Sequence, residues 1–140
     1  MPNATWFSEI ESKVFSTVSY RLKRELRGKL SGTLKCTTDG ASDSAPYFPT
    51  WYLHELEPME TGQDLTNETV NAVIEVIEVQ AYTKSKSECQ LIMDETVVQM
   101  KALRFNVSMM PLVTSNTNVF TGVARFRRIV GGGDSDIITQ

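Results

Sequence analysis

The sequence predicts an α+β fold, in which a mixed, mainly antiparallel β-sheet of about four to five strands packs against a long N-terminal helix and a second, central helix. A β-branched run at 72–82 carries apolar residues on both faces, which is typical of a central strand with neighbours on both edges. Residues 8–30 repeat apolar side chains every four positions, as amphipathic helices do. Residues 85–103 repeat them at spacings of three and four, which predicts the second helix.

The first helix is expected to begin at Ser8, because Ser8 and Glu11 have the spacing of a capping box, and to end at Gly28 or Gly32. Its buried stripe is predicted to hold Ile10, Val14, Val18, Leu22 and Leu26. Basic residues gather toward its C-terminal end, where they complement the helix dipole: Arg21, Lys23, Arg24, Arg27 and Lys29. Phosphate binding by this end stays open as an alternative, although no DNA-binding motif surrounds it.

The other elements follow from composition and alternation. A short strand is expected at 34–38 and a second at 47–57, with Pro49 tolerated at its start. The central helix should be capped by Ser85 with Glu88. Pro111 makes the strand at 105–113 an edge or bulged one, and 119–130 alternates as a long, half-buried strand.

The chain is predicted to form one domain over 1–130, followed by a flexible tail over 131–140 that begins with three glycines. Two polar segments, Asp39 to Pro46 and 58–68, are expected to be mobile loops that order in part on assembly. The core is predicted to contain the inward-facing apolar residues Val73, Ile77, Val79, Ile92, Met93, Val97, Met100, Phe120 and Phe126.

Catalytic and metal-binding motifs are not found in the sequence, so we expect neither an enzyme nor a cofactor. The single histidine, His54, is interpreted as a partly buried polar side chain within a strand. Cys36 and Cys89 are expected to be free thiols, and Cys89 to fill the interface between helix and sheet. No apolar run is long enough to span a bilayer, and no membrane partner is predicted.

Charge is divided unevenly along the chain. Residues 1–35 carry +4, residues 36–100 carry −10 and residues 101–140 carry +3. A chain with such blocks can supply complementary surfaces to copies of itself, although a solvated acidic face is the simpler interpretation. We expect Arg125, Arg127 and Arg128 to meet acidic residues of a neighbouring protomer, with Glu75 and Glu78 as further interface candidates. Pairing of these arginines with Glu75 or Glu78 of the same chain remains the alternative.

Four short features of the chain occur in a characteristic order: Phe48-Pro49 opening a strand, the strand at 74–82 followed by a capped helix, Leu103 to Phe105 before Met110-Pro111, and Ala124 to Phe126 in the closing strand. In these features the chain resembles the tail terminator (tail completion, head-to-tail joining) proteins of long-tailed bacteriophages. The resemblance runs from about Tyr47 to Val130. Arg104 stands where a glycine is common in the family.

The resemblance implies a structural virion protein at the head-tail junction, assembled in the host cytoplasm. It implies a ring, hexameric in form, that caps the tail tube protein, stops its polymerisation and joins the head connector, with DNA passing through the lumen. A head-completion or stopper protein of the same neck is the main alternative. A basic-helix module that binds nucleic acid is the second.

Overall fold

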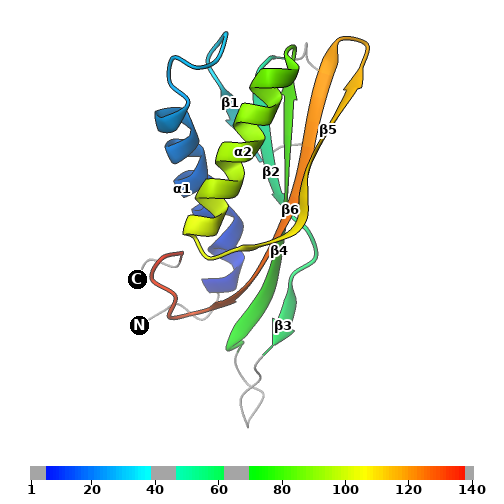
Figure 1. Cartoon of the computed structure of the whole chain (residues 1–140). Coiled ribbons are helices and arrows are strands. Elements are labelled where there is room, and N and C mark those ends of the chain that lie inside the picture. The colour runs from blue at the N-terminus through cyan, green and yellow to red at the C-terminus, as the bar shows by residue number, and fades with distance from the viewer. Residues whose placement is uncertain (1–5, 39–46, 62–69, 138–140) are drawn as a thin grey trace.

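The computed structural model describes residues 6–38, 47–61 and 70–137. The α+β class is confirmed: two helices pack on one mixed, mostly antiparallel sheet (Figure 1). The elements in chain order are the 3₁₀ turn η1 (Trp6–Glu9), α1 (Ile10–Glu25), β1 (Lys35–Thr37), β2 (Thr50–Glu55), β3 (Met59–Thr61), β4 (Ala72–Thr83), α2 (Lys86–Ala102), β5 (Asn106–Asn116) and β6 (Val119–Gly131).

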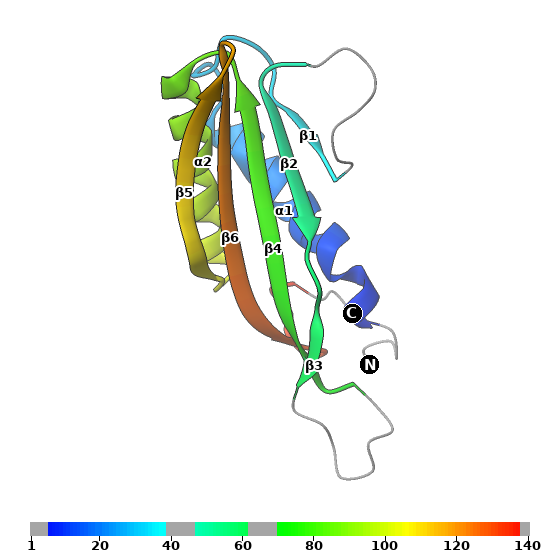
Figure 2. The same ribbon diagram turned by 90° about the vertical axis from the view of Figure 1, so that its right-hand side faces the viewer.

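The strand order is β1-β2-β4-β6-β5, and β3 pairs with the start of β4. Only β1 and β2 are parallel to each other; the remaining pairs are antiparallel. Both helices cover the same face of the sheet, and the other face carries no helix (Figure 2). We call these the inner face and the outer face.

The prediction of β4 as the central strand is confirmed, since β2 and β3 pair along one edge and β6 pairs along the other over its whole length. Seven of the predicted core residues are buried, and Val97 and Phe120 are partly buried against the core. Trp51 and Phe105 are also fully buried, and the Trp51 indole donates to Thr96 Oγ1 at 3.0 Å. The core therefore lies between the inner face and the two helices.

The start of α1 differs from the predicted capping box. A 3₁₀ turn precedes the helix, and Glu9 stands at the N-cap without a side-chain hydrogen bond. Glu11 accepts instead from the backbone N–H of Glu55 at 2.7 Å, so its carboxylate ties α1 to the end of β2. The helix ends at Glu25, before Gly28, whose φ of 76° suits the turn that follows.

Both ends of α2 have recognisable caps. The predicted N-cap is confirmed, because the Ser85 side chain accepts from the Glu88 N–H. At the other end, the Phe105 N–H donates to the Met100 carbonyl and the Arg104 N–H to the Lys101 carbonyl, which is a Schellman arrangement. Arg104 has a φ of 66°, the conformation for which glycine is preferred at this position.

The expectation of an edge or bulged strand around Pro111 is confirmed. β5 is the last strand of the sheet, and its register with β6 shifts between Val107 and Met109 and again between Met109 and Leu112. A proline lacks the N–H that a strand neighbour on its open edge would need.

Two predictions for the polar segments are corrected. Residues 59–61 form β3 instead of a loop, because their backbone pairs with Ala72 to Ile74 of β4. Residues 131–137 are not a free tail: Gly131 ends β6, and Ile137 is buried in the core. The predicted loops at 39–46 and 62–68 and the last three residues lie outside the described residues. Within the described residues, neither helix is long and apolar enough to cross a membrane.

Candidate assembly surface

The outer face of the sheet is the candidate functional site, because neither described helix covers it and its strands carry both apolar and charged side chains. Alternation along β6 sends Phe126 and Val130 to the core, and Arg125, Arg127 and Ile129 to the outer face. The register of the sheet then places outward side chains of neighbouring strands in rows.

Two of these rows are apolar. Met59, Ile74 and Ile129 lie side by side across β3, β4 and β6, and the first and last of them are 63% and 55% exposed. Near the β5 edge, Leu112 is 62% exposed and pairs with Val123. Exposed apolar groups gathered on one face, with polar residues around them, are typical of protein interaction sites.

A polar network centred on Glu78 separates the two rows. The carboxylate of Glu78 accepts from Arg125 Nε at 2.9 Å and from Gln80 Nε2 at 2.7 Å, and Tyr82 donates to Gln80. Burial acts to raise the pKa of Glu78, but the hydrogen bonds from Gln80 and Arg125 and the Arg125 charge outweigh it and lower the pKa. Glu78 is therefore a stable anion.

His54 joins the same network from β2. Its Nε2 lies 3.6 Å from Glu78 Oε1, and its ring stacks on Tyr52 with centroids 4.8 Å apart. Its Nδ1 is buried without a hydrogen-bond partner among the described residues. The prediction of a partly buried polar histidine is confirmed, and the network holds its ring in one orientation.

Of the three arginines predicted at the interface, two pair within the chain. Arg125 pairs with Glu78, which is the alternative that the sequence left open. Arg127 lies between Val76 and Asn106 in the sheet register and is exposed, with no ion pair to any described residue. Arg127 is thus the arginine of this face whose charge is available to a partner.

Arg128 does not belong to the outer face, so its assignment to the interface is corrected. It is 7% exposed on the inner side, where it donates to the Leu103 carbonyl and to Asp136 and lies 3.3 Å from Asp134. Arg128 and Arg104 lower the pKa of Asp136, outweighing the opposite effect of burial. This arginine fixes the C-terminal turn to the end of α2.

Glu75 is also on the inner side and is fully buried. Neither of its carboxylate oxygens accepts a hydrogen bond from a described donor. Burial, reinforced by the neighbouring Glu55 and then Glu11, raises the pKa of Glu75 to about 10. Glu75 is therefore protonated and neutral at pH 7, able to donate to Glu55, and it is not an anionic interface group.

Sequence reasoning found Arg125, Arg127 and Glu78 but missed the partners that organise them. The available signal was the alternation of polar and aromatic side chains on two adjacent strands, Tyr52 and His54 on one and Glu78, Gln80 and Tyr82 on the other. The network could not be predicted from it, because the register between the two strands is known only from the structure.

No cluster of three or more metal-ligating side chains occurs in residues 6–38, 47–61 and 70–137. No protein-family model matches the chain, and no curated protein matches its sequence.

Proposed function

We propose that the protein is a structural virion component of the tail terminator type, which assembles into a hexameric ring at the head-tail junction. The ring caps the tail tube protein, stops its polymerisation and joins it to the head connector or stopper, with DNA passing through the lumen. The subunit has a mechanical role and carries out no catalysis.

The observation that supports self-assembly is the outer face. It combines exposed apolar side chains, Met59, Leu112 and Ile129, with Arg127, a cation that forms no ion pair with any described residue. The two helices cover the opposite face of the sheet. An interface needs an apolar centre to associate and charged groups to fix orientation, and this face supplies both. A folded chain that leaves such a face open gains free energy by covering it.

The test is the oligomeric state of the full chain, measured by native mass spectrometry and by averaging negatively stained particles. The wild-type chain should form a closed ring without DNA. Ile129→Asp and Arg127→Glu should each give folded monomers or small oligomers, because they place a charge in the apolar row or reverse the available cation.

Val98→Asp is the matched control, since the exposure of Val98 on α2, 56%, is close to the 55% of Ile129, but Val98 faces away from the outer face. It should leave the ring intact. A monomeric wild-type chain, or rings unaffected by both outer-face variants, would contradict the proposal.

The two alternatives give different results in two further measurements. A head-completion or stopper protein would form rings that bind the connector but do not cap purified tail tubes. A nucleic-acid-binding module would remain without a ring and bind duplex DNA with strong salt dependence through the exposed basic residues at the end of α1.

A further inference from the structure

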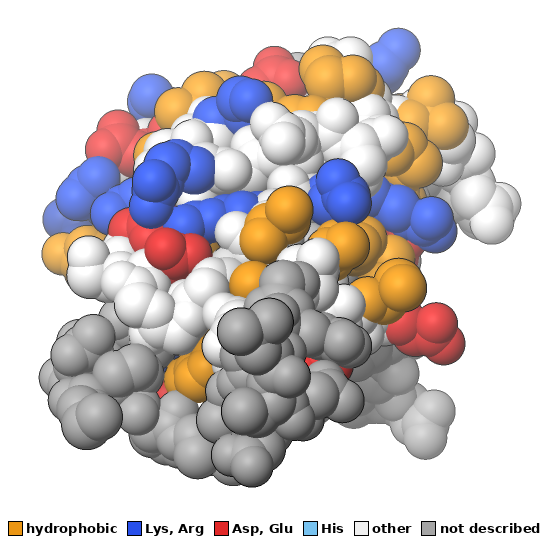
Figure 3. All heavy atoms as spheres, turned by 90° about the horizontal axis from the view of Figure 1, so that it is seen from below, with side chains coloured by type: hydrophobic (Ala, Val, Ile, Leu, Met, Phe, Trp, Pro, Cys, Tyr) orange, Lys and Arg blue, Asp and Glu red, His pale blue; other side chains and the backbone are white. Residues whose placement is uncertain are grey.

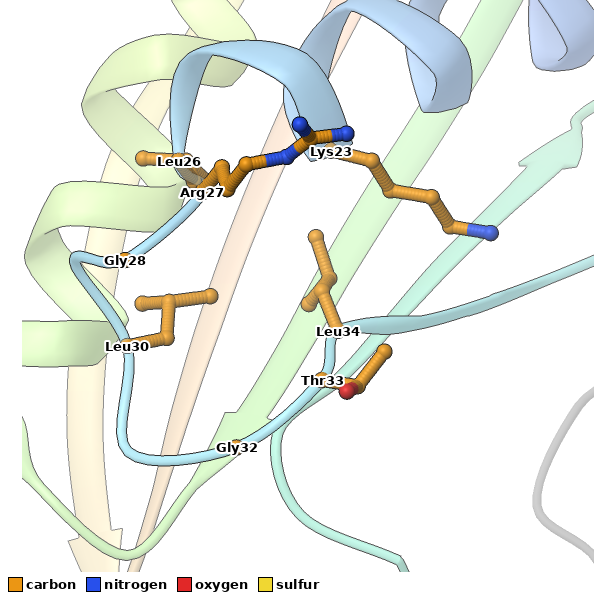
Figure 4. Close-up of a pocket in the computed structure, with 8 residues that line it drawn as sticks. All are labelled: Lys23, Leu26, Arg27, Gly28, Leu30, Gly32, Thr33 and Leu34. Atoms are coloured by element: carbon orange, nitrogen blue, oxygen red, sulfur yellow. The ribbon is translucent and has the colours of Figure 1, made fainter.

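A small pocket lies where α1 ends and the chain turns toward β1 (Figure 4). Its volume is about 280 Å³. Leu30 and Leu34 point into it from the loop, while Lys23 and Arg27 extend along its α1 side. Of the residues that line it, Leu26 and Leu34 are buried, whereas Lys23 and Arg27 are exposed.

The walls of this pocket are held in place by contacts from outside it. The loop residue Ser31 donates its backbone N–H to Glu88 Oε1 at 2.6 Å and its hydroxyl to Glu88 Oε2 at 3.2 Å. The Lys35 N–H then donates to the Pro49 carbonyl at 3.0 Å. The loop is therefore anchored to α2 and to the start of β2, so the pocket is preformed.

The shape and charge of the pocket select one kind of occupant. A water occupies about 30 Å³ and ligand sites for small molecules span about 300–1,000 Å³, so this pocket suits a single large side chain. Buried leucines together with the exposed cations of Lys23 and Arg27 fit an apolar side chain that has a carboxylate beside it.

The chain carries such a group at its other end. Met59 on β3 is 63% exposed, and Glu57, two residues before it, is exposed as well. β3 lies at the opposite end of the molecule from the α1 pocket in both ribbon views (Figures 1 and 2). Seen from below, Lys and Arg side chains form a band across the surface, with hydrophobic side chains among them (Figure 3). The two sites cannot meet within one chain.

We propose that Met59 of one copy inserts into the α1 pocket of the next copy, with Glu57 facing Lys23 and Arg27. This inference rests on the proposed ring and names the two surfaces that join its subunits. A contact between two different surfaces of one protomer is heterologous, and such contacts close into a ring when the rotation between subunits allows it. Met59 also extends the apolar row of Ile74 and Ile129, so the pocket contact and the outer-face contact are continuous.

The first experiment is a charge exchange, read by native mass spectrometry of the full chain. Glu57→Lys and Arg27→Glu should each weaken ring formation at least tenfold. The double variant Glu57→Lys/Arg27→Glu restores opposite charges at every contact and should recover rings. The matched control is Glu57→Lys/Arg24→Glu, because Arg24 is an exposed α1 arginine that does not line the pocket; it should not recover them.

A second experiment does not depend on ring stability. Met59→Cys/Leu30→Cys, treated with a short bismaleimide, should give a ladder of covalent oligomers, whereas the wild-type chain and each single variant should not. Wild-type rings without that ladder, or rings that persist in Arg27→Glu, would overturn the pocket contact while leaving the proposed function intact. A wild-type chain that forms no ring would overturn both.

Discussion

Gly122 of β6 lies directly against Met93 of α2: a Cβ built on Gly122 would be 2.5 Å from Met93 Cγ. The same Cβ would be 3.1 Å from Cys89 Sγ, and both Met93 and Cys89 are fully buried. Gly122 thus sets how closely the central helix approaches the sheet, which confirms that Cys89 and Met93 fill this interface.

Gly122→Ala should therefore destabilise the fold by about 1–3 kcal/mol, the usual cost of overpacking a filled core. Chemical denaturation of the two proteins measures the difference. Gly133→Ala is the control, because no atom lies within 4 Å of a Cβ at that position and its stability should stay close to wild type. Equal stability of all three proteins would show that α2 can shift without cost.

Ile77 lies in the middle of β4, faces the core and is fully buried. Ile77→Ala should cost roughly 2–5 kcal/mol, because the cavity left beneath the helices cannot fully collapse. Ile77→Val should cost only about 0.5–1.5 kcal/mol. An unchanged melting temperature in the alanine variant would contradict the place of β4 at the centre of the sheet.

Glu75 makes stability depend on pH in a defined direction. Its pKa is about 10 in the folded chain against an ordinary value of 4.5, so folding takes up a proton between these values. The contribution of the protonated group is fully present below about pH 4.5 and is lost as the pH rises toward 10. The corresponding slope approaches about 1.4 kcal/mol per pH unit for one proton.

Glu75→Gln should remove that slope, so its stability relative to wild type should rise steadily from pH 5 to pH 9. Urea denaturation at several pH values gives the comparison. Asp94→Asn, at an exposed position on α2, serves as the control and should follow the wild-type curve. Parallel curves for Glu75→Gln and wild type would show that the buried carboxyl finds a cation or donor when it ionises.

Arg127 and Arg128 are neighbours in sequence, but replacing them should have different effects on the stability of the fold. Arg128→Met removes the side-chain donor to the Leu103 carbonyl and one cation beside Asp134 and Asp136. It should cost about 1–3 kcal/mol, because Asp136 keeps Arg104 and Asp134 keeps the Gly131 N–H. Arg127→Met removes no ion pair among the described residues and should change monomer stability by less than about 0.5 kcal/mol.

The Arg128 effect should also depend on pH. Because the pKa of Asp136 is lowered in the folded chain, the stabilisation is present above the ordinary aspartate value and is lost as the pH falls through the lowered one. The difference between Arg128→Met and wild type should therefore shrink in acid. A difference that stays constant down to pH 2 would assign the cost to packing.

Local patterns were sufficient to predict most of the fold. The Ser85 cap, the alternation in β4 and β6, and the edge position of Pro111 depend on neighbours in sequence, and each is confirmed. β3 was missed because three residues without periodicity become a strand only by pairing with β4. Ser8 was assigned a cap that Glu11 does not complete, since its carboxylate binds the distant Glu55 N–H.

The candidate site was predicted less completely, for the same reason. Alternation correctly put Arg125 and Arg127 on one side of β6, but it could not reveal that Glu78 neutralises one of them. The burial of Arg128 depends on Asp134 and Asp136, which sit in a segment that composition alone describes as a free tail. Sequence reports the charges of a strand, whereas the fold decides which of them remain for a partner.

The bulged β5 edge of the sheet limits how a second copy of the chain can pair with it. Strand pairing along an open edge adds one copy after another without a natural stopping point, which is the route to fibres. Pro111 and the two register shifts interrupt the regular hydrogen-bonding pattern of the β5 edge, so this edge is a poor template for a further strand. The proposed ring therefore relies on side-chain contacts between faces and needs no strand pairing at the β5 edge.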